Sequence, residues 1–85
     1  MPAPEPFQLY VKTWCPWCIR AMAMLDQAGY RYEKIDVEAD PAAYREMIRR
    51  SGQSLTPTLV VGERVLADFG PPELLAFLQR HALKP

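Results

Sequence analysis

The pattern of apolar residues changes period several times along the chain, and this alternation limits the folds that the chain can adopt. Residues 7–12 alternate and are rich in β-forming side chains, which predicts a strand. Over residues 16–28 the apolar side chains recur at helical spacing, and Gly29 is a plausible end of the helix. The chain therefore begins as a strand followed directly by a helix.

The same change of period recurs to the end of the chain. Asp40 followed by Pro41 predicts the start of the second helix, which should run to Gly52. The other predicted elements are strands over residues 30–37, 56–61 and 65–67 and a last helix over residues 71–83. The order is β-α-β-α-β-β-α, which predicts an α/β protein with a four-stranded mixed sheet and three helices. Because helices join the first three strands, we expect these to pair in parallel, and the last two strands to form an antiparallel hairpin.

Length and charge exclude several classes of protein. A chain of 85 residues suits a single domain, which we place at residues 6–85, after a disordered tail over residues 1–5. The 10 basic and 10 acidic residues balance, so no basic excess indicates a nucleic-acid partner. No apolar stretch reaches the ~18 residues of a membrane span, and the first residues do not resemble a signal peptide. We therefore expect a cytoplasmic monomer that binds neither nucleic acid nor membrane.

Cys15 and Cys18 are the only cysteines, and their spacing allows several interpretations. A structural disulfide is disfavoured because closing a loop of ~4 residues stabilises a chain least, and such bonds are rare in the cytoplasm. A zinc site needs four Cys or His ligands, and only the distant His81 remains. A metal shared between two chains and a pair of unrelated buried thiols stay open. A C-x-x-C that follows a strand and opens a helix favours a redox pair.

The redox interpretation assigns a role to each sulfur. Cys15 would lie at the first turn of the helix, where free N–H groups and the positive helix end favour its thiolate. Such placement lowers a thiol pKa from ~8.5 toward ~3.5–7.5. Cys18 would lie on the same helix face and remain a thiol, so Cys15 attacks and Cys18 resolves the mixed disulfide. Lys12 is either a further source of positive potential near Cys15 or a solvated side chain at a strand end.

Two segments of the chain resemble the glutaredoxin family. YVKTWCPWC resembles the family's first strand, lysine and C-P-[YW]-C site, and REMIRRSGQSLTPTLVVGERV resembles its second helix, Thr-Pro loop and hairpin. The resemblance implies a thioredoxin fold in which Pro57 is a cis-proline facing Cys15. A cis bond after Thr56 would turn the backbone of that residue toward an extended thiol substrate. The family's glutathione contacts would fall on Lys12, which meets a carboxylate, and on Trp17 beside the active site.

The segment before the last helix departs from the family pattern. Ala67 and Asp68 occupy the positions of the usual Gly-Gly pair. The backbone N–H groups of the next residues, Phe69 and Gly70, are predicted to bind a carboxylate of glutathione. The segment DFGPPEL also resembles the G-F-x-P segment of small redoxins that thioredoxin reductase reduces and that serve ribonucleotide reductase.

These residues predict a dithiol glutaredoxin-like thiol–disulfide oxidoreductase with catalytic Cys15 and Cys18. Glutathione is the expected reductant and co-substrate, protein disulfides or glutathionylated proteins are the expected partners, and neither a metal nor a permanently bound cofactor is expected. One alternative changes the reductant to thioredoxin reductase. Another, a glutathione-bridged iron–sulfur carrier, is disfavoured by Pro16 and Trp17, because the cluster-binding relatives generally have a smaller or more open loop.

Overall fold

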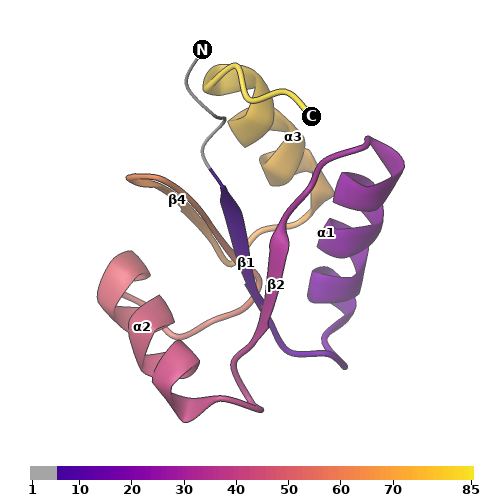
Figure 1. Cartoon of the computed structure of the whole chain (residues 1–85). Helices are drawn as coiled ribbons and strands as arrows, with labels where there is room; N and C mark the ends of the chain where they lie inside the picture. Colours follow the sequence, from indigo (N-terminus) through magenta and orange to yellow (C-terminus); the bar gives the residue numbers. More distant parts are fainter. Residues whose placement is uncertain (1–5) are drawn as a thin grey trace.

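Residues 6–85 fold into one sheet with three helices. The computed structural model describes residues 6–85, so the predicted tail over residues 1–5 lies outside the described residues. The elements, shown in Figure 1, are β1 (Phe7–Val11), α1 (Pro16–Gln27), β2 (Glu33–Asp36), α2 (Pro41–Ser51), β3 (Thr58–Val61), β4 (Arg64–Ala67) and α3 (Pro71–Arg80). The predicted order β-α-β-α-β-β-α and the mixed four-stranded sheet are confirmed.

The strands lie in the spatial order β2-β1-β3-β4. β1 pairs in parallel with β2 and antiparallel with β3, and β3 and β4 form the predicted antiparallel hairpin. The expectation that the first three strands all pair in parallel is therefore wrong for β3.

The connection after α2 explains the direction of β3. Thr58, the first residue of β3, pairs with Tyr10 near the end of β1, so β3 begins at the edge of the sheet where β1 ends. α2 has 11 residues, or ~16 Å at ~1.5 Å per residue. Residues 52–57 span up to ~20 Å at ~3.3–3.6 Å per residue, enough to return the chain along the length of α2. In Figure 1 this return segment runs from the end of α2 back to the sheet.

Two elements are shorter in the structure than predicted: β2 begins later and α3 ends earlier. β2 begins at Glu33 rather than at residue 30 because Tyr30 belongs to the turn that closes α1. Its N–H donates to the carbonyl of Leu25 at 2.9 Å, and its hydroxyl donates to the carbonyl of Leu83 at 2.6 Å. α3 ends at Arg80, since Ala82 has a positive φ of 52° that no helix continues through.

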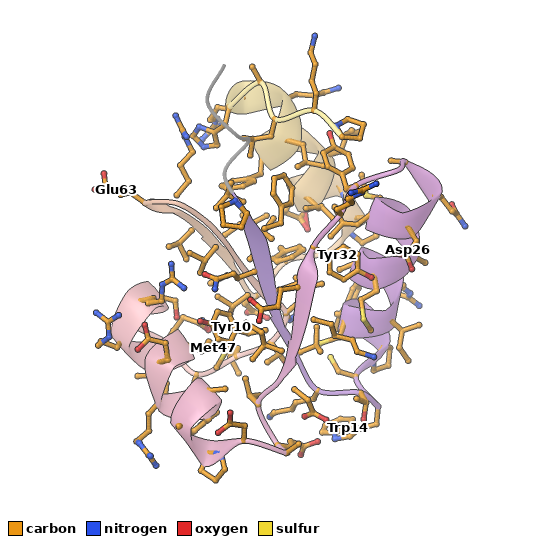
Figure 2. The ribbon with its side chains drawn as sticks, in the orientation of Figure 1. Tyr10, Trp14, Asp26, Tyr32, Met47 and Glu63 are labelled. Atoms are coloured by element: carbon orange, nitrogen blue, oxygen red, sulfur yellow. The ribbon has the colours of Figure 1, made fainter. Side chains whose placement is uncertain are left out.

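The sheet is covered on both faces. Phe7, Leu9 and Val11 alternate along β1 and join the core cluster that contains the buried residues of α1 and α3. Tyr10 points to the other face, where it lies in a second cluster with Met47 of α2. Figure 1 shows α2 on the side of the sheet opposite to α1, and Figure 2 labels Tyr10 and Met47 within that layer. Because α1 starts directly after the central strand, the sheet fixes the position of Cys15.

Candidate active site

Cys15 is the N-cap residue of α1. Its backbone is extended, with φ −73° and ψ 121°, and Pro16 occupies the first helical position. The Cys15 N–H donates to the carbonyl of Lys12 at 3.1 Å, and the Cys15 carbonyl accepts from the N–H of Ile19 at 3.0 Å. This tight turn between β1 and α1 places the Cys15 side chain at the free N–H groups of the helix start, as predicted.

Hydrogen bonds favour the thiolate of Cys15. Burial alone would raise the pKa of the Cys15 thiol, but these bonds bring it below its ordinary value. The donors are the backbone N–H and the thiol of Cys18, the backbone N–H of Trp17 and the side chain of Thr56. Two of them are backbone groups of the first turn of α1, so the helix start contributes directly to the ionisation of Cys15.

The pKa of Cys18 is shifted in the opposite direction. Burial raises the pKa of the Cys18 thiol above its ordinary value, and hydrogen bonds from the Thr56 side chain and the Lys12 backbone lower it only in part. Cys18 is 0% exposed and Cys15 is 8% exposed. Both cysteines are free thiols. Cys15 is thus both the more acidic and the more accessible sulfur of the pair.

The peptide bond between Thr56 and Pro57 is cis, as the family resemblance implies. Pro57 is fully buried, and its carbonyl accepts from the N–H of Asp68 at 2.9 Å. The Thr56 side chain is among the groups that lower the pKa of Cys15 and of Cys18, so this loop lies beside the cysteines. The loop that precedes β3 and the start of α1 therefore form a single site.

The Gln53 side chain holds the segment before Pro57. Its Nε2 donates to Thr58 Oγ1 at 2.9 Å, and its Oε1 accepts from the N–H of Leu55 at 2.7 Å. Thr58 Oγ1 in turn donates to the carbonyl of Leu55 at 2.8 Å. The sequence prediction did not include Gln53. A glutamine shortly before a Thr-Pro pair was the one available signal.

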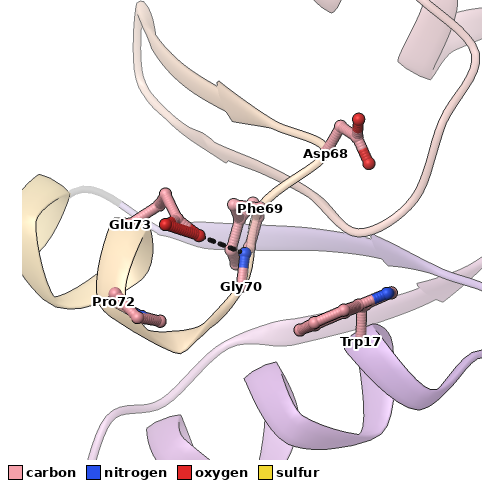
Figure 3. Close-up of a pocket in the computed structure, with 6 residues that line it drawn as sticks. All are labelled: Trp17, Asp68, Phe69, Gly70, Pro72 and Glu73. Carbon is pink, nitrogen blue, oxygen red and sulfur yellow. Dashed lines mark hydrogen bonds between the residues drawn. The ribbon is translucent and has the colours of Figure 1, made fainter.

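An open cleft of about 500 Å³ lies beside Trp17. Figure 3 shows its lining residues, which are Trp17, Asp68, Phe69, Gly70, Pro72 and Glu73. The predicted glutathione-binding residues Trp17, Phe69 and Gly70 are thus brought together. Trp17 is 50% exposed, with the Arg20 guanidinium carbon 4.8 Å from its ring centroid, whereas the Phe69 side chain is buried. The Gly70 N–H donates to Glu73 Oε1 at 2.8 Å, so this predicted donor is already occupied.

Lys12 precedes Cys15 in the chain, whereas Trp17 follows it. The Lys12 side chain contacts a second tryptophan, Trp14. Its Nζ is 5.8 Å from the ring centroid of Trp14. Trp14 Nε1 donates to Glu38 Oε1 at 2.6 Å. The sequence prediction missed Trp14 and Glu38, although an aromatic residue directly before the first cysteine was visible.

Two negative findings concern residues 6–85. Within this range, no three or more His, Cys, Asp or Glu side chains gather in a way that would hold a metal ion. None of the helices in the same range is long and apolar enough to cross a membrane.

A helix-start cysteine with a buried partner beside a cis-proline loop, on this sheet, defines a thiol–disulfide oxidoreductase of the thioredoxin fold. The sequence profile of the family described as Glutaredoxin matches residues 7–66. Glutaredoxin 3 of Escherichia coli strain K12 is 31% identical over 78 residues, which cover 92% of each chain. The chain belongs to the glutaredoxin family.

Solved structures agree on the fold. NrdH-redoxin from Escherichia coli superposes with a TM-score of 0.72 at 22% identity, covering 94% of this chain and 96% of that one. The buckwheat glutaredoxin–glutathione complex superposes with a TM-score of 0.68 at 23% identity, covering 92% of this chain and 71% of that one. Likeness at these identities concerns the fold alone.

Proposed function

We propose that this glutaredoxin uses glutathione to reduce protein disulfides or glutathionylated proteins. The observation that carries the proposal is the opposite pKa shift of the two thiols, lowered for Cys15 and raised for Cys18, at the start of one helix. A thiolate and a neighbouring thiol are the two forms that an attacking and a resolving cysteine require.

The exchange proceeds in two steps, and each step forms one disulfide bond and breaks another. The Cys15 thiolate attacks one sulfur of the substrate disulfide, which forms a mixed disulfide and releases the other sulfur as a thiolate that takes up a proton. Cys18 then loses its proton and attacks Cys15, which forms the Cys15–Cys18 disulfide and releases the second substrate thiol. Two glutathione molecules return two electrons to this disulfide and leave as glutathione disulfide.

Several groups support binding of the glutathione moiety. Thr56, the residue before Pro57, would pair its backbone with an extended peptide substrate. The cleft beside Trp17 has room for a γ-glutamyl group, and Phe69 is one of its lining residues. Lys12 offers a cation for a carboxylate. Buckwheat glutaredoxin, which shares the fold, has been solved in complex with glutathione.

A second candidate keeps the chemistry and changes the reductant to thioredoxin reductase, with ribonucleotide reductase as the acceptor of electrons. The charge of the Trp17 cleft favours it: Asp68 and Glu73 both line the cleft, and Glu73 occupies the Gly70 donor. Negative charge at this place weakens the binding of a substrate carboxylate.

A comparison of reductants tests the proposal. Purified protein is given bis(2-hydroxyethyl) disulfide and NADPH, with glutathione and glutathione reductase in one assay and thioredoxin reductase in the other. We expect NADPH oxidation in the first assay, and no oxidation above background with the Cys15→Ser variant. Turnover with thioredoxin reductase and none with glutathione would contradict the proposed reductant and support the second candidate.

The proposal extends to the setting in which this chemistry would operate. We propose a cytoplasmic monomer with a glutaredoxin domain over residues 6–85 and no permanently bound cofactor. The glutathione pool of the cytoplasm is reducing enough to regenerate the dithiol. Sedimentation of the reduced and oxidised protein at several concentrations tests the monomer, because a dimer would sediment faster as the concentration rises.

A further inference from the structure

The side chain of Trp14 is exposed, yet polar contacts fix its position. It is 64% exposed, so burial of its ring stabilises its position little. Its Nε1–H instead donates to Glu38 Oε1 at 2.6 Å, and the Lys12 ammonium lies 5.8 Å from its ring centroid. Figure 2 labels Trp14 at the end of the molecule where β1 and β2 both end. Trp14 thus connects the segment before Cys15 to the segment after β2.

The carboxylate that holds Trp14 is itself presented by an ordered turn. Asp36 ends β2 and pairs with Val11 at the end of β1. An oxygen of the Asp36 side chain accepts from the N–H of Glu38 at 2.9 Å and from the N–H of Ala39 at 3.2 Å. This turn is a common way for an aspartate to fix the two residues that follow it. Glu38 is therefore held next to the active-site segment by the sheet itself.

The Lys12 cation interacts with the face of the Trp14 ring. An ammonium within about 6 Å of an indole centroid is attracted by the negative face of the ring. The backbone of Lys12 is fixed as well, because its carbonyl accepts from the N–H of Cys15 at 3.1 Å. A substrate carboxylate that approaches Cys15 must compete with this ring for the ammonium, and it also meets the negative charge of Glu38.

We propose that Trp14 and Glu38 are specificity-determining positioning residues that hold the Lys12 ammonium and weaken its attraction for the carboxylates of anionic disulfides. This inference rests on two parts of the proposed function: Cys15 is the attacking thiol, and the Lys12 ammonium attracts a substrate carboxylate. It holds whichever reductant regenerates the dithiol. The structure assigns this task to Trp14 and Glu38 because the Trp14 indole contacts both the Lys12 ammonium and the Glu38 carboxylate, and neither Trp14 nor Glu38 belongs to the cysteine pair.

The test compares an anionic and a neutral disulfide. Fully reduced protein is mixed with glutathione disulfide or with bis(2-hydroxyethyl) disulfide, and the two second-order rate constants are measured by stopped flow. Their ratio reports the attraction for carboxylates and cancels changes in the thiol itself. We expect Trp14→Ala to raise the ratio of anionic to neutral rates by about two- to fivefold, the range that an exposed cation–π contact supports.

Three further variants separate the contributions. Trp14→Phe keeps a ring for Lys12 but loses the donor to Glu38, and we expect a smaller rise of the ratio. Glu38→Gln removes the charge and keeps an amide oxygen as acceptor, and it should also raise the ratio. Glu63→Gln is the matched control, because Glu63 lies in the turn between β3 and β4, far from Trp14 in Figure 2. It should leave the ratio at the wild-type value.

The Lys12→Met background decides whether Lys12 carries the effect. There we expect Trp14→Ala to leave the ratio unchanged, because no ammonium remains to be released. An unchanged or lower ratio for Trp14→Ala with Lys12 present, a rise that persists in full with Lys12→Met, or an equal rise for Glu63→Gln would overturn the inference. Failure of glutathione as reductant contradicts only the proposed function, because these stoichiometric reactions do not use it.

Discussion

The backbone N–H of Gly70 donates a hydrogen bond to Oε1 of Glu73 at 2.8 Å. Gly70 is the N-cap residue of α3, and Glu73 is the third residue of that helix. A carboxylate at this position reaches back to the free donor of the cap and interacts favourably with the positive helix end. The same N–H is one of the two, with that of Phe69, that are predicted from the sequence to bind a substrate carboxylate. Glu73 therefore stabilises the helix, and under the proposed function it would compete with a substrate carboxylate for the Gly70 N–H.

Glu73→Ala should lower the KM for glutathione. The substitution frees the Gly70 N–H and removes a negative charge from the Trp17 cleft, and we expect a decrease of about two- to fivefold, corresponding to the ~0.3–1 kcal/mol of a charge at a helix start. The helix should lose stabilisation of the same order. The coupled assay with glutathione reductase measures KM, and urea denaturation measures the free energy of unfolding.

Glu73→Gln is the matched variant for this prediction. Its amide oxygen still accepts from the Gly70 N–H, while the charge is gone, so its KM should lie between those of the wild type and Glu73→Ala. An unchanged KM in both variants would show that glutathione does not place a carboxylate near Gly70.

The packing of α2 on the sheet gives a prediction about stability. Met47 is 0% exposed and faces Tyr10 in the second core cluster, whereas the next residue, Ile48, is 36% exposed. Met47→Ala should lower the free energy of unfolding by about 2–5 kcal/mol, because it leaves a cavity under α2. Ile48→Ala should cost less than about 1 kcal/mol. Equal losses in urea denaturation would contradict the observed orientation of α2.

The order of elements was predictable because each signal is local. Alternation in residues 7–12, helical spacing after Pro16, and Asp40 before Pro41 each depend on a few neighbouring residues. In the structure Asp40 accepts hydrogen bonds from the N–H groups of Ala42 and Ala43, as an N-cap should. The antiparallel pairing of β1 with β3 depends instead on how far residues 52–57 carry the chain back, and no local pattern encodes that.

In the candidate site, too, some features follow from local sequence patterns and others depend on the register of the sheet. The position of Cys15 at the start of α1 follows from the strand–Cys-Pro–helix pattern alone. The contact between Trp14 and Glu38 joins residues 24 positions apart, and the one between Asp68 and Pro57 joins two different loops. Such pairs meet only through the parallel β1–β2 pairing and the β3–β4 hairpin. Their partners could not be chosen from the sequence without the register of the sheet.

The two cysteines should differ in what their removal does. Cys15→Ser should abolish exchange with every disulfide, because the only accessible thiolate is lost. Cys18→Ser should accumulate the mixed disulfide on Cys15, since the second attack has no sulfur. Mass spectrometry after reaction with glutathione disulfide measures the adduct, which should appear for Cys18→Ser and not for Cys15→Ser. An adduct of equal yield in both variants would contradict the assignment of roles.

The thiol of Cys18 is one of the hydrogen-bond donors that hold the pKa of Cys15 below its ordinary value, after the backbone N–H of the same residue. The rate of Cys15 alkylation by iodoacetamide follows its thiolate, so it should fall as the pH drops through the lowered pKa. In Cys18→Ser the hydroxyl replaces the donor, and the midpoint should remain below the ~8.5 of a free cysteine.

Cys18→Ala is the informative counterpart, because it removes the side-chain donor and leaves the N–H groups of Cys18 and Trp17 in place. The midpoint of its alkylation curve should therefore lie at higher pH than that of Cys18→Ser and still below ~8.5. Each variant contains a single cysteine, so the curve reports Cys15 alone. Coincident curves would show that the Cys18 side chain does not acidify Cys15. Midpoints near ~8.5 in both variants would show that the start of α1 does not either.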